Sequence, residues 1–272
     1  MRKMVFIIGL CLSILLVGMN ATATELDVLI LVADSSAQIE ADAVMSYGKI
    51  GADTFNYTQV NIATGGTRPI DGSVILADEV NAGNLDFSDY NIIWLPWNGP
   101  GHDGDYFMEG VEDNILSFVE QGGVVYMAAF DDNFTDANGS QIGGWMPIDK
   151  YPATVSNTAD SELTLTAEGE ATGIFDGVDL SGLVLDDNFA NTDPAYIILA
   201  VRDDNGEPAA IQLNYGAGAY LGVCTDARST FPAAEPMVGN ILAYAASIVS
   251  AVTPVEPVDK LPATWGDMKS EY

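Results

Sequence analysis

His102 is the only histidine in the 272-residue sequence, so it is the one side chain that could act as a general base near neutral pH without a shifted pKa. It lies in a glycine-rich segment, residues 97–105, which contains no serine, threonine or cysteine to serve as a nucleophile. Two interpretations follow: a catalytic base, or a loop histidine that hydrogen-bonds to a neighbouring backbone carbonyl. His102 is therefore a candidate catalytic residue without a defined reaction.

A second group of chemically capable side chains follows the apolar run 124–130. It consists of Asp131, Asp132, Asn133, Asp136 and Asn138. Carboxylate and amide oxygens in a loop suit Ca²⁺, so these residues predict a calcium site. Their spacing does not match the EF-hand loop, and Asp and Asn also form ordinary turns, so both interpretations stay open. Residues 186–189 repeat the sequence Asp-Asp-Asn-Phe of residues 131–134.

Apolar runs that predict buried strands stand directly before both groups. The runs 26–33, 90–96 and 124–130 show little alternation, which is typical of strands covered on both faces of a parallel sheet, and residues 215–224 return to that sheet. Ligands of open parallel sheets bind outside the carboxyl ends of the strands. We therefore predict a binding face formed by Asp34, Trp97, His102, Asp131, Asp132 and Asp226.

Helical segments alternate with these strands. The first predicted helix carries an apolar stripe, the second covers residues 107–118, and the last begins at Pro236. The stripe of the first helix comprises Ile39, Ala43, Tyr47 and Ile50. Strand, helix and strand in this order imply right-handed crossovers and a parallel sheet.

The second half of the chain has a different texture. Between residues 140 and 215, short alternating strands are predicted at 162–166 and 182–185, followed by a hairpin over 195–213. The predicted fold class is α/β, with a flavodoxin-like central parallel sheet flanked by helices and a β-rich excursion in the second half.

The first 23 residues have the pattern of a secretory signal peptide. Arg2 and Lys3 precede an uncharged stretch, residues 4–17, and the small-x-small sequence Ala-Thr-Ala ends at Ala23. We expect a mature chain that begins at Thr24, has no transmembrane span and is secreted, periplasmic or extracellular. A single α/β domain is predicted over residues 24–252.

Residues 253–272 form a predicted proline-rich linker and C-terminal tail. Residues 261–264, Leu-Pro-Ala-Thr, resemble the start of a sortase signal, but Trp265 stands where that signal requires glycine. A sorting or docking tag and a frayed terminus are both compatible with this pattern.

The charge balance restricts the partners. The chain has a formal net charge of −30, and loss of residues 1–23 would leave 7 basic and 39 acidic residues, a net charge of −32. Nucleic acid and anionic lipid are therefore excluded as natural partners. Trp97 and Trp145, in predicted loops, could stack on sugar rings or anchor their own loops, so carbohydrate or a cell-envelope component is the partner we expect. Only Cys224 would remain after cleavage, which rules out an intrachain disulfide.

The order of these segments resembles the class I glutamine amidotransferase-like superfamily, and within it the ThuA-like branch. The resemblance covers most of residues 26–250 and rests on the first strand, on residues 88–96 and 115–126, on the turn and strand 215–222, and on the helix around 238–244. These features carry a fold, so the resemblance implies architecture more than chemistry.

The catalytic residues that this resemblance implies are not matched. Amidotransferases of the superfamily place a nucleophilic cysteine directly after a central strand, with a histidine and an acid supplied from near the C-terminal end. The corresponding residues here are 127–130, Met-Ala-Ala-Phe, and no histidine follows His102. ThuA-like relatives often carry histidines after the first strand, where this chain has Asp34-Ser35-Ser36. We therefore expect no amidotransferase activity.

Three functions remain in view. The one we favour is a secreted, non-catalytic binding or scaffold module that uses the predicted binding face. The first alternative is a ThuA-like carbohydrate-processing hydrolase in which His102, with Asp131 or Asp132, positions a metal ion or water. The second is a structural envelope protein attached through its C-terminal tail.

Overall fold

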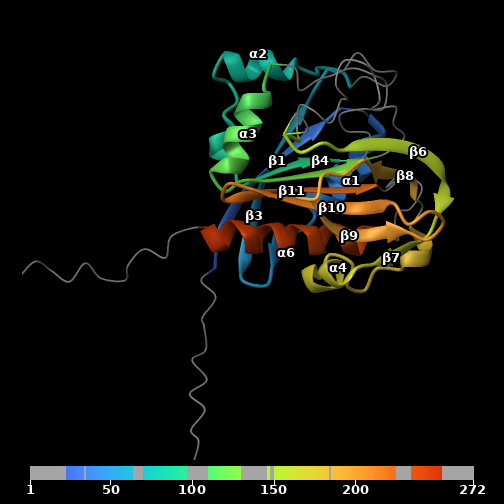
Figure 1. Cartoon of the computed structure of the whole chain (residues 1–272). Helices are drawn as coiled ribbons and strands as arrows, with labels where there is room; N and C mark the ends of the chain where they lie inside the picture. Colours follow the sequence, from blue (N-terminus) through green and yellow to red (C-terminus); the bar gives the residue numbers. More distant parts are fainter. Residues whose placement is uncertain are drawn as a thin grey trace, which may run out of the picture.

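A mixed nine-stranded sheet forms the centre of the protein, and helices cover both of its faces (Figure 1). The computed structural model describes residues 23–33, 35–63, 70–96, 110–129, 146–147, 150–183, 185–224 and 234–252. The strand order is β2-β3-β1-β4-β5-β11-β10-β9-β7. The predicted α/β class, with parallel central strands between helices, is confirmed.

Five parallel strands make up the middle of the sheet. Their pairing runs β3 to β1, β1 to β4, β4 to β5 and β5 to β11, which is the flavodoxin-like arrangement with its first strand one place from the edge. Their bounds are β1 Glu25–Val32, β3 Asp53–Asn61, β4 Ile92–Leu95, β5 Val124–Ala129 and β11 Gly218–Cys224.

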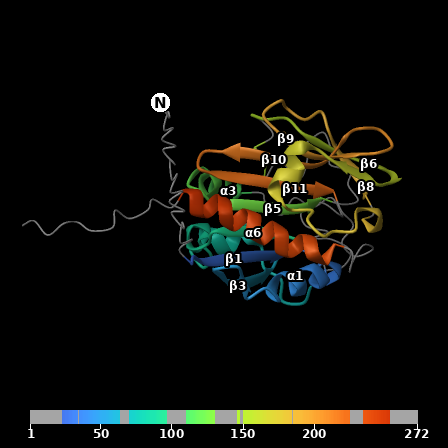
Figure 2. The same cartoon turned by 90° about the horizontal axis from the view of Figure 1, so that it is seen from below.

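Alternate side chains of the central strands enter two separate cores. Val28 and Ile30 of β1 join the core under α1 (Gln38–Met45) and α6 (Glu235–Val252), which Figure 2 shows from below. Leu29 and Leu31 join the core under α2 (Leu76–Asn81) and α3 (Glu112–Glu120). Because both faces are covered, the strands have the continuous apolar sequences from which they were predicted.

The predicted stripe of the first helix is wrong. Ile39 is 46% exposed, and α1 ends at Met45, so Tyr47 and Ile50 lie beyond it. The buried face of this segment consists of Ala37, Glu40, Ala41 and Val44. A glutamate occupies the centre of that face, which is why a search for apolar periodicity selected a different stripe.

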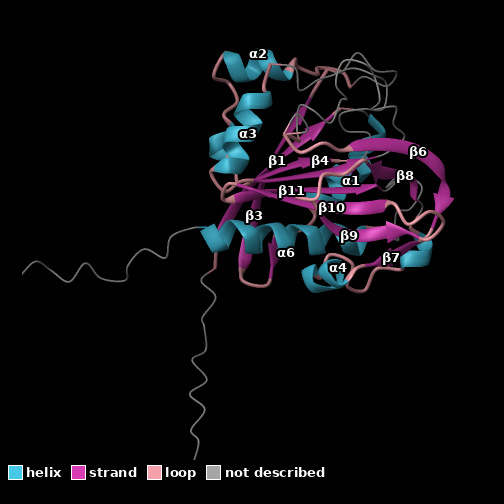
Figure 3. Cartoon of the chain, viewed as in Figure 1, coloured by secondary structure: helices cyan, strands magenta, loops and turns pink. Residues whose placement is uncertain are grey.

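Antiparallel strands extend the sheet beyond β11 (Figure 3). The predicted hairpin is confirmed as β9 (Ile197–Arg202) and β10 (Pro208–Tyr215), and β7 (Leu163–Leu165) pairs with β9 at the edge. At the opposite edge, β2 (Lys49–Ile50) pairs with β3. The short helix α4 (Ala167–Thr172) was not predicted; Thr166 begins it by accepting a hydrogen bond from the Gly169 N–H at 3.0 Å.

A separate two-stranded ribbon packs on this part of the sheet. It consists of β6 (Thr154–Ser161) and β8 (Leu185–Ala190), and β8 contacts β10 and β11. The Phe189 ring lies against Gly222 of β11, where a Cβ atom would stand 2.8 Å from the ring carbon Cζ. Gly222 therefore allows the ribbon to approach the sheet closely.

Three short 3₁₀ helices complete the described secondary structure: η1 (Ser35–Ala37), η2 (Phe87–Asp89) and η4 (Leu180–Gly182). Within the described ranges, no helix has both the length and the apolar character needed to cross a bilayer.

Substituting Gly222→Ala should destabilise the protein by about 1–3 kcal/mol, because the added methyl group overpacks the contact with Phe189. Gly48→Ala is the matched control, since a Cβ at Gly48 has no neighbour within 4 Å. Urea unfolding of both variants measures the difference. Equal free energies of unfolding would show that the ribbon does not pack on β11 in this way.

Candidate functional site

Four parallel strands end side by side at one edge of the sheet, which we call the carboxyl edge. β1, β4, β5 and β11 are consecutive in the strand order, and at this edge Leu95 is paired with Met127 and Ala129 with Cys224. Each predicted binding segment continues from one of these strands in the sequence. The topology therefore brings the starting points of those segments together, as expected of a ligand-binding edge.

The predicted site residues themselves lie outside the described residues. They are Asp34, Trp97, His102, Asp131, Asp132, Asn133, Asp136, Asn138 and Asp226. The predicted binding face, the candidate base and the calcium site stay predictions. What the structure does define is the buried framework from which these segments start.

A buried carboxylate lies on the α1 side of the carboxyl edge. Glu40 is 2% exposed, and its Oε1 accepts a hydrogen bond from Trp94 Nε1 at 2.8 Å. Trp94 is the third residue of β4, and Glu40 lies in the helix that follows β1. A hydrogen bond to a charged group is strong in a buried environment, so this bond ties helix α1 to the middle of the sheet.

Tyr126 extends this cluster to the next strand. It is the register partner of Trp94, and the two ring centroids are 4.2 Å apart with an interplanar angle of 45°. Burial raises the pKa of Tyr126 well above its usual value, and the nearby Glu40 and Cys224 add to the effect. The phenol therefore remains neutral at physiological pH and serves as a packed, uncharged support.

A buried cation lies at the same end of the sheet, on the other side of β11. Arg202 ends β9, and the pairs Val201–Pro208 and Ala210–Val223 place that strand end level with the carboxyl end of β11. Arg202 is 1% exposed; its Nη1 donates to the carbonyl oxygen of Asp187 at 3.0 Å.

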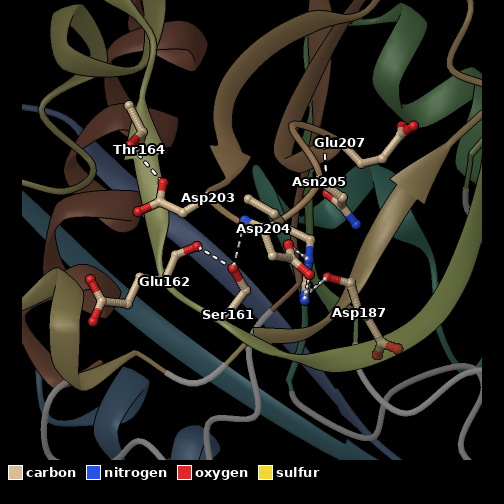
Figure 4. Close-up of polar contacts among 9 residues, drawn as sticks. Ser161, Glu162, Thr164, Asp187, Asp203, Asp204, Asn205 and Glu207 are labelled. Atoms are coloured by element: carbon tan, nitrogen blue, oxygen red, sulfur yellow. Dashed lines mark hydrogen bonds and ion pairs between the residues drawn. The ribbon is translucent and has the colours of Figure 1, made fainter.

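The carboxylate of Asp204 provides the ionic partner of this guanidinium. Arg202 Nε and Nη2 donate to its two oxygens at 3.0 and 3.2 Å, a bidentate arrangement visible in Figure 4. The hydrogen bonds from Arg202 lower the pKa of Asp204. Asp187 and Asn188 of β8 are also buried, so this flank combines polar groups from the ribbon and from the sheet.

The acidic residues around the β9–β10 turn are engaged in local hydrogen bonds (Figure 4). Thr164 Oγ1 donates to Asp203 Oδ1 at 2.7 Å, and the Glu207 N–H donates to Asn205 Oδ1 at 2.8 Å. In the part of the chain that the structure describes, no three His, Cys, Asp or Glu side chains are grouped so as to hold a metal ion. Turn formation accounts for this acidic cluster.

Cys224 is a buried thiol, as the sequence predicted. It ends β11, is 1% exposed, and packs in the core under α2 and α3. Its register partner is Ala129, so the cysteine lies on the strand next to β5 rather than after β5. A thiol in this position has no access to a ligand at the surface.

Sequence reasoning missed Glu40, Asp187 and Arg202 as buried polar residues. The one available signal for Glu40 was its place among Ala37, Ala41 and Val44, which together form a helical face. The repeated Asp-Asp-Asn-Phe at 186–189 drew attention to Asp187, but nothing local indicated that it would be buried.

Comparison with known proteins identifies a fold. No protein-family model matches the chain, and no curated protein matches it in sequence. A GMP synthase subunit from Thermoplasma acidophilum has a similar structure, with a TM-score of 0.51, 9% identity, and coverage of 83% of this chain and 97% of that chain. The protein therefore has a glutamine amidotransferase-like fold.

Weaker structural similarities extend to two other proteins. A ThuA-like protein from Parabacteroides merdae has a TM-score of 0.47 at 12% identity, covering 82% of this chain and 91% of that chain. A β-galactosidase from Rahnella sp. R3 has a TM-score of 0.45 at 14% identity, covering 82% of this chain and 31% of that chain. At identities this low, structural similarity carries no information about activity.

Substituting Trp94→Phe should lower the free energy of unfolding by about 2 kcal/mol, because Glu40 loses a buried hydrogen-bond donor. The same substitution made in a Glu40→Met background is the control, and there its cost should be smaller. Urea unfolding of the four proteins gives the coupling energy. A coupling energy of zero would show that the indole and the carboxylate do not interact.

Alkaline unfolding should begin above pH 10, because the ordinary pKa of a tyrosine is 10.0. Burial raises the folded-state pKa of Tyr57, Tyr126, Tyr196 and Tyr220. The unfolded state therefore loses these protons first, so stability is full below pH 10 and falls as the pH rises further. Absorbance at the tyrosinate band should increase together with loss of circular dichroism; ionisation of all tyrosines before unfolding would contradict this.

Proposed function

We propose that this protein is a secreted, non-catalytic binding module that takes its ligand at the carboxyl edge. The observation that carries the proposal is the position of Cys224, buried on β11 and beside β5 instead of directly after it. The residues after β5 are Phe130, Asp131, Asp132 and Asn133, none of which is a nucleophile of the amidotransferase type. A retained fold without that nucleophile favours binding over acyl transfer.

The framework of the carboxyl edge supports a binding role. Four consecutive strand ends present four separate segments to one ligand, which is how open parallel sheets build their sites. The buried pairs Glu40–Trp94 and Arg202–Asp204 lie below this edge and hold α1 and the β9–β10 turn in place. A rigid framework reduces the ordering cost of binding.

Secretion is supported by the start of the folded domain. The Thr24 nitrogen donates to Asp53 Oδ1 at 3.1 Å. Cleavage after Ala23 would convert this nitrogen into an ammonium group beside the carboxylate, which strengthens the contact. The proposed cleavage site and the first residues of β1 are thus compatible with each other.

The ligand class we propose is a carbohydrate or another component of the cell envelope. The strongly negative net charge disfavours anionic ligands, and Trp97 supplies an aromatic ring for stacking on a sugar. Asp131, Asp132, Asn133, Asp136 and Asn138 are the residues we propose for Ca²⁺. Turn formation is the competing explanation for these five residues.

The rival function, a ThuA-like carbohydrate-processing hydrolase, makes a different prediction for His102. The mature chain, residues 24–272, should release no nitrophenol from a panel of nitrophenyl glycosides, since binding alone forms no products. His102→Ala should change the affinity for fragments of envelope polysaccharide by less than about threefold. Trp97→Ala should weaken that affinity by about tenfold, the loss of one stacking contact.

Turnover that His102→Ala abolishes would replace the binding function by the hydrolase. Loss of affinity in neither variant would remove the carboxyl edge as the ligand site. Isothermal titration and a discontinuous product assay, applied to the same protein preparations, give both readings.

Calcium binding should raise the unfolding temperature of the mature chain by several degrees at low millimolar Ca²⁺, because ligand that binds only the native state stabilises it. The control is NaCl at matched ionic strength. Asp131→Asn should remove the Ca²⁺-specific increase, whereas Asp71→Asn, which deletes one exposed charge in a described turn, should not. An equal response of the two variants would assign the effect to general screening.

A further inference from the structure

A second hollow lies at the opposite edge of the sheet, where β4 and β5 begin. It is a cavity of about 800 Å³ between η2, α3, the end of α2 and the last turns of α6. In Figure 1 these elements surround the amino ends of the strands, away from the carboxyl edge. The volume is within the range of small-molecule sites.

Asn91 is held rigidly in the wall of this cavity. Its backbone N–H donates to Asp27 O at 2.8 Å, and its backbone carbonyl accepts from Val124 N at 3.0 Å. Its side-chain Oδ1 accepts from the Asp27 N–H at 2.9 Å. Since Oδ1 must be the acceptor of that N–H, the amide orientation is determined.

The other end of the Asn91 amide is available to a ligand. Among the described residues, no group accepts a hydrogen bond from Asn91 Nδ2, and the side chain is only partly exposed. A fixed NH₂ group of this kind offers two donors to ligand oxygens without a further loss of side-chain entropy.

Hydrogen-bond acceptors lie in the same wall. Asp86 uses Oδ1 for both the N–H and the hydroxyl of Ser88, at 2.9 and 2.8 Å, which leaves Oδ2 facing outward from that turn as an acceptor. Gln121 donates its Nε2 to Ser117 Oγ at 2.8 Å, so its Oε1 also remains an acceptor. A ligand that both donates and accepts, as a hydroxyl group does, matches these groups.

Aromatic rings supply the apolar part of the lining. The Phe118 ring is packed against Gly123, where an added Cβ atom would collide with the ring. Phe87 is buried below the cavity, and the half-buried Tyr90 ring stands between Phe87 and Asn91 in the sequence. Amide groups together with an aromatic surface are typical of sites that bind sugar rings.

Charge excludes the other ligand classes of this size. No Lys, Arg or His is among the described residues that line the cavity, and the chain as a whole has a net charge of −30, so phosphates and carboxylates are disfavoured. Asp86 is the single carboxylate of this described lining, too few for a metal ion.

We propose that this cavity is a binding site for a neutral, hydroxyl-rich ligand of the saccharide class, separate from the carboxyl edge. Asn91 is the residue that orients the ligand, through its two fixed donors. The inference stands independently of the proposed function, because it uses residues at the other edge of the sheet.

The test is Asn91→Asp, which keeps an oxygen to accept from the Asp27 N–H and removes only the two donors. The probes are cellobiose, lactose, maltotriose and mannobiose, titrated into the mature chain up to about 10 mM and followed by protein NMR. Asn205→Asp is the matched control: it adds the same charge, keeps the hydrogen bond from the Glu207 N–H and lies in the β9–β10 turn.

At least one probe should bind, with resonances of α3 and η2 shifting, and Asn91→Asp should weaken that binding by about tenfold or more while Asn205→Asp leaves it unchanged. Asn114→Ala, an exposed change on α3, should weaken it without affecting folding. The thermal unfolding of each variant verifies that it is folded.

Binding of none of the probes, or binding that Asn91→Asp does not alter, would overturn the inference. Binding that only Trp97→Ala weakens would do the same while supporting the carboxyl edge. The failure of this site and the failure of the proposed function are therefore distinguishable.

Discussion

Burial of the parallel sheet on both faces is the constraint on which the rest of the structure depends. From Val28 to Val32, every side chain of β1 is fully buried, and β4 is buried along its whole length. The two cores can form only if α1 and α6 cover one face and α2 and α3 cover the other. This arrangement leaves the two ends of the sheet as the places where polar backbone and side chains meet solvent.

Polar residues that enter this interior do so in pairs. Glu40 has the Trp94 indole as a donor, and Arg202 has the Asp204 carboxylate and the Asp187 carbonyl oxygen as acceptors. Each pair connects elements that are distant in sequence: α1 with β4, and the β9–β10 turn with β8. Because a buried polar group that loses its partner costs more than an ordinary contact, these pairs specify how the layers fit together.

The two edges of the sheet differ in physical character. The carboxyl edge collects chain segments from four strands, and its framework contains buried charges, whereas the amino edge has a cavity lined by amides, hydroxyl groups and aromatic rings. A nucleophile in the amidotransferase position would have to follow β5, and the residues that follow it are acidic and amide side chains. The fold is thus shared with enzymes, while the polar groups on it favour recognition.

The sequence by itself determined the class of fold. Continuous apolar runs at β1, β4, β5 and β11, separated by helices, required a buried parallel sheet, and the hairpin of β9 and β10 followed from its turn residues at 203–206. The predicted site residues follow strand ends that the topology places together, although those residues lie outside the described part of the chain. Tertiary structure alone decided that Glu40 faces Trp94, that the ribbon of β6 and β8 rests on Gly222, and that Asn91 holds its amide toward a cavity. The reason is physical: periodicity reports which faces are apolar, but the partner of a buried polar group is chosen by contacts between residues far apart in the chain.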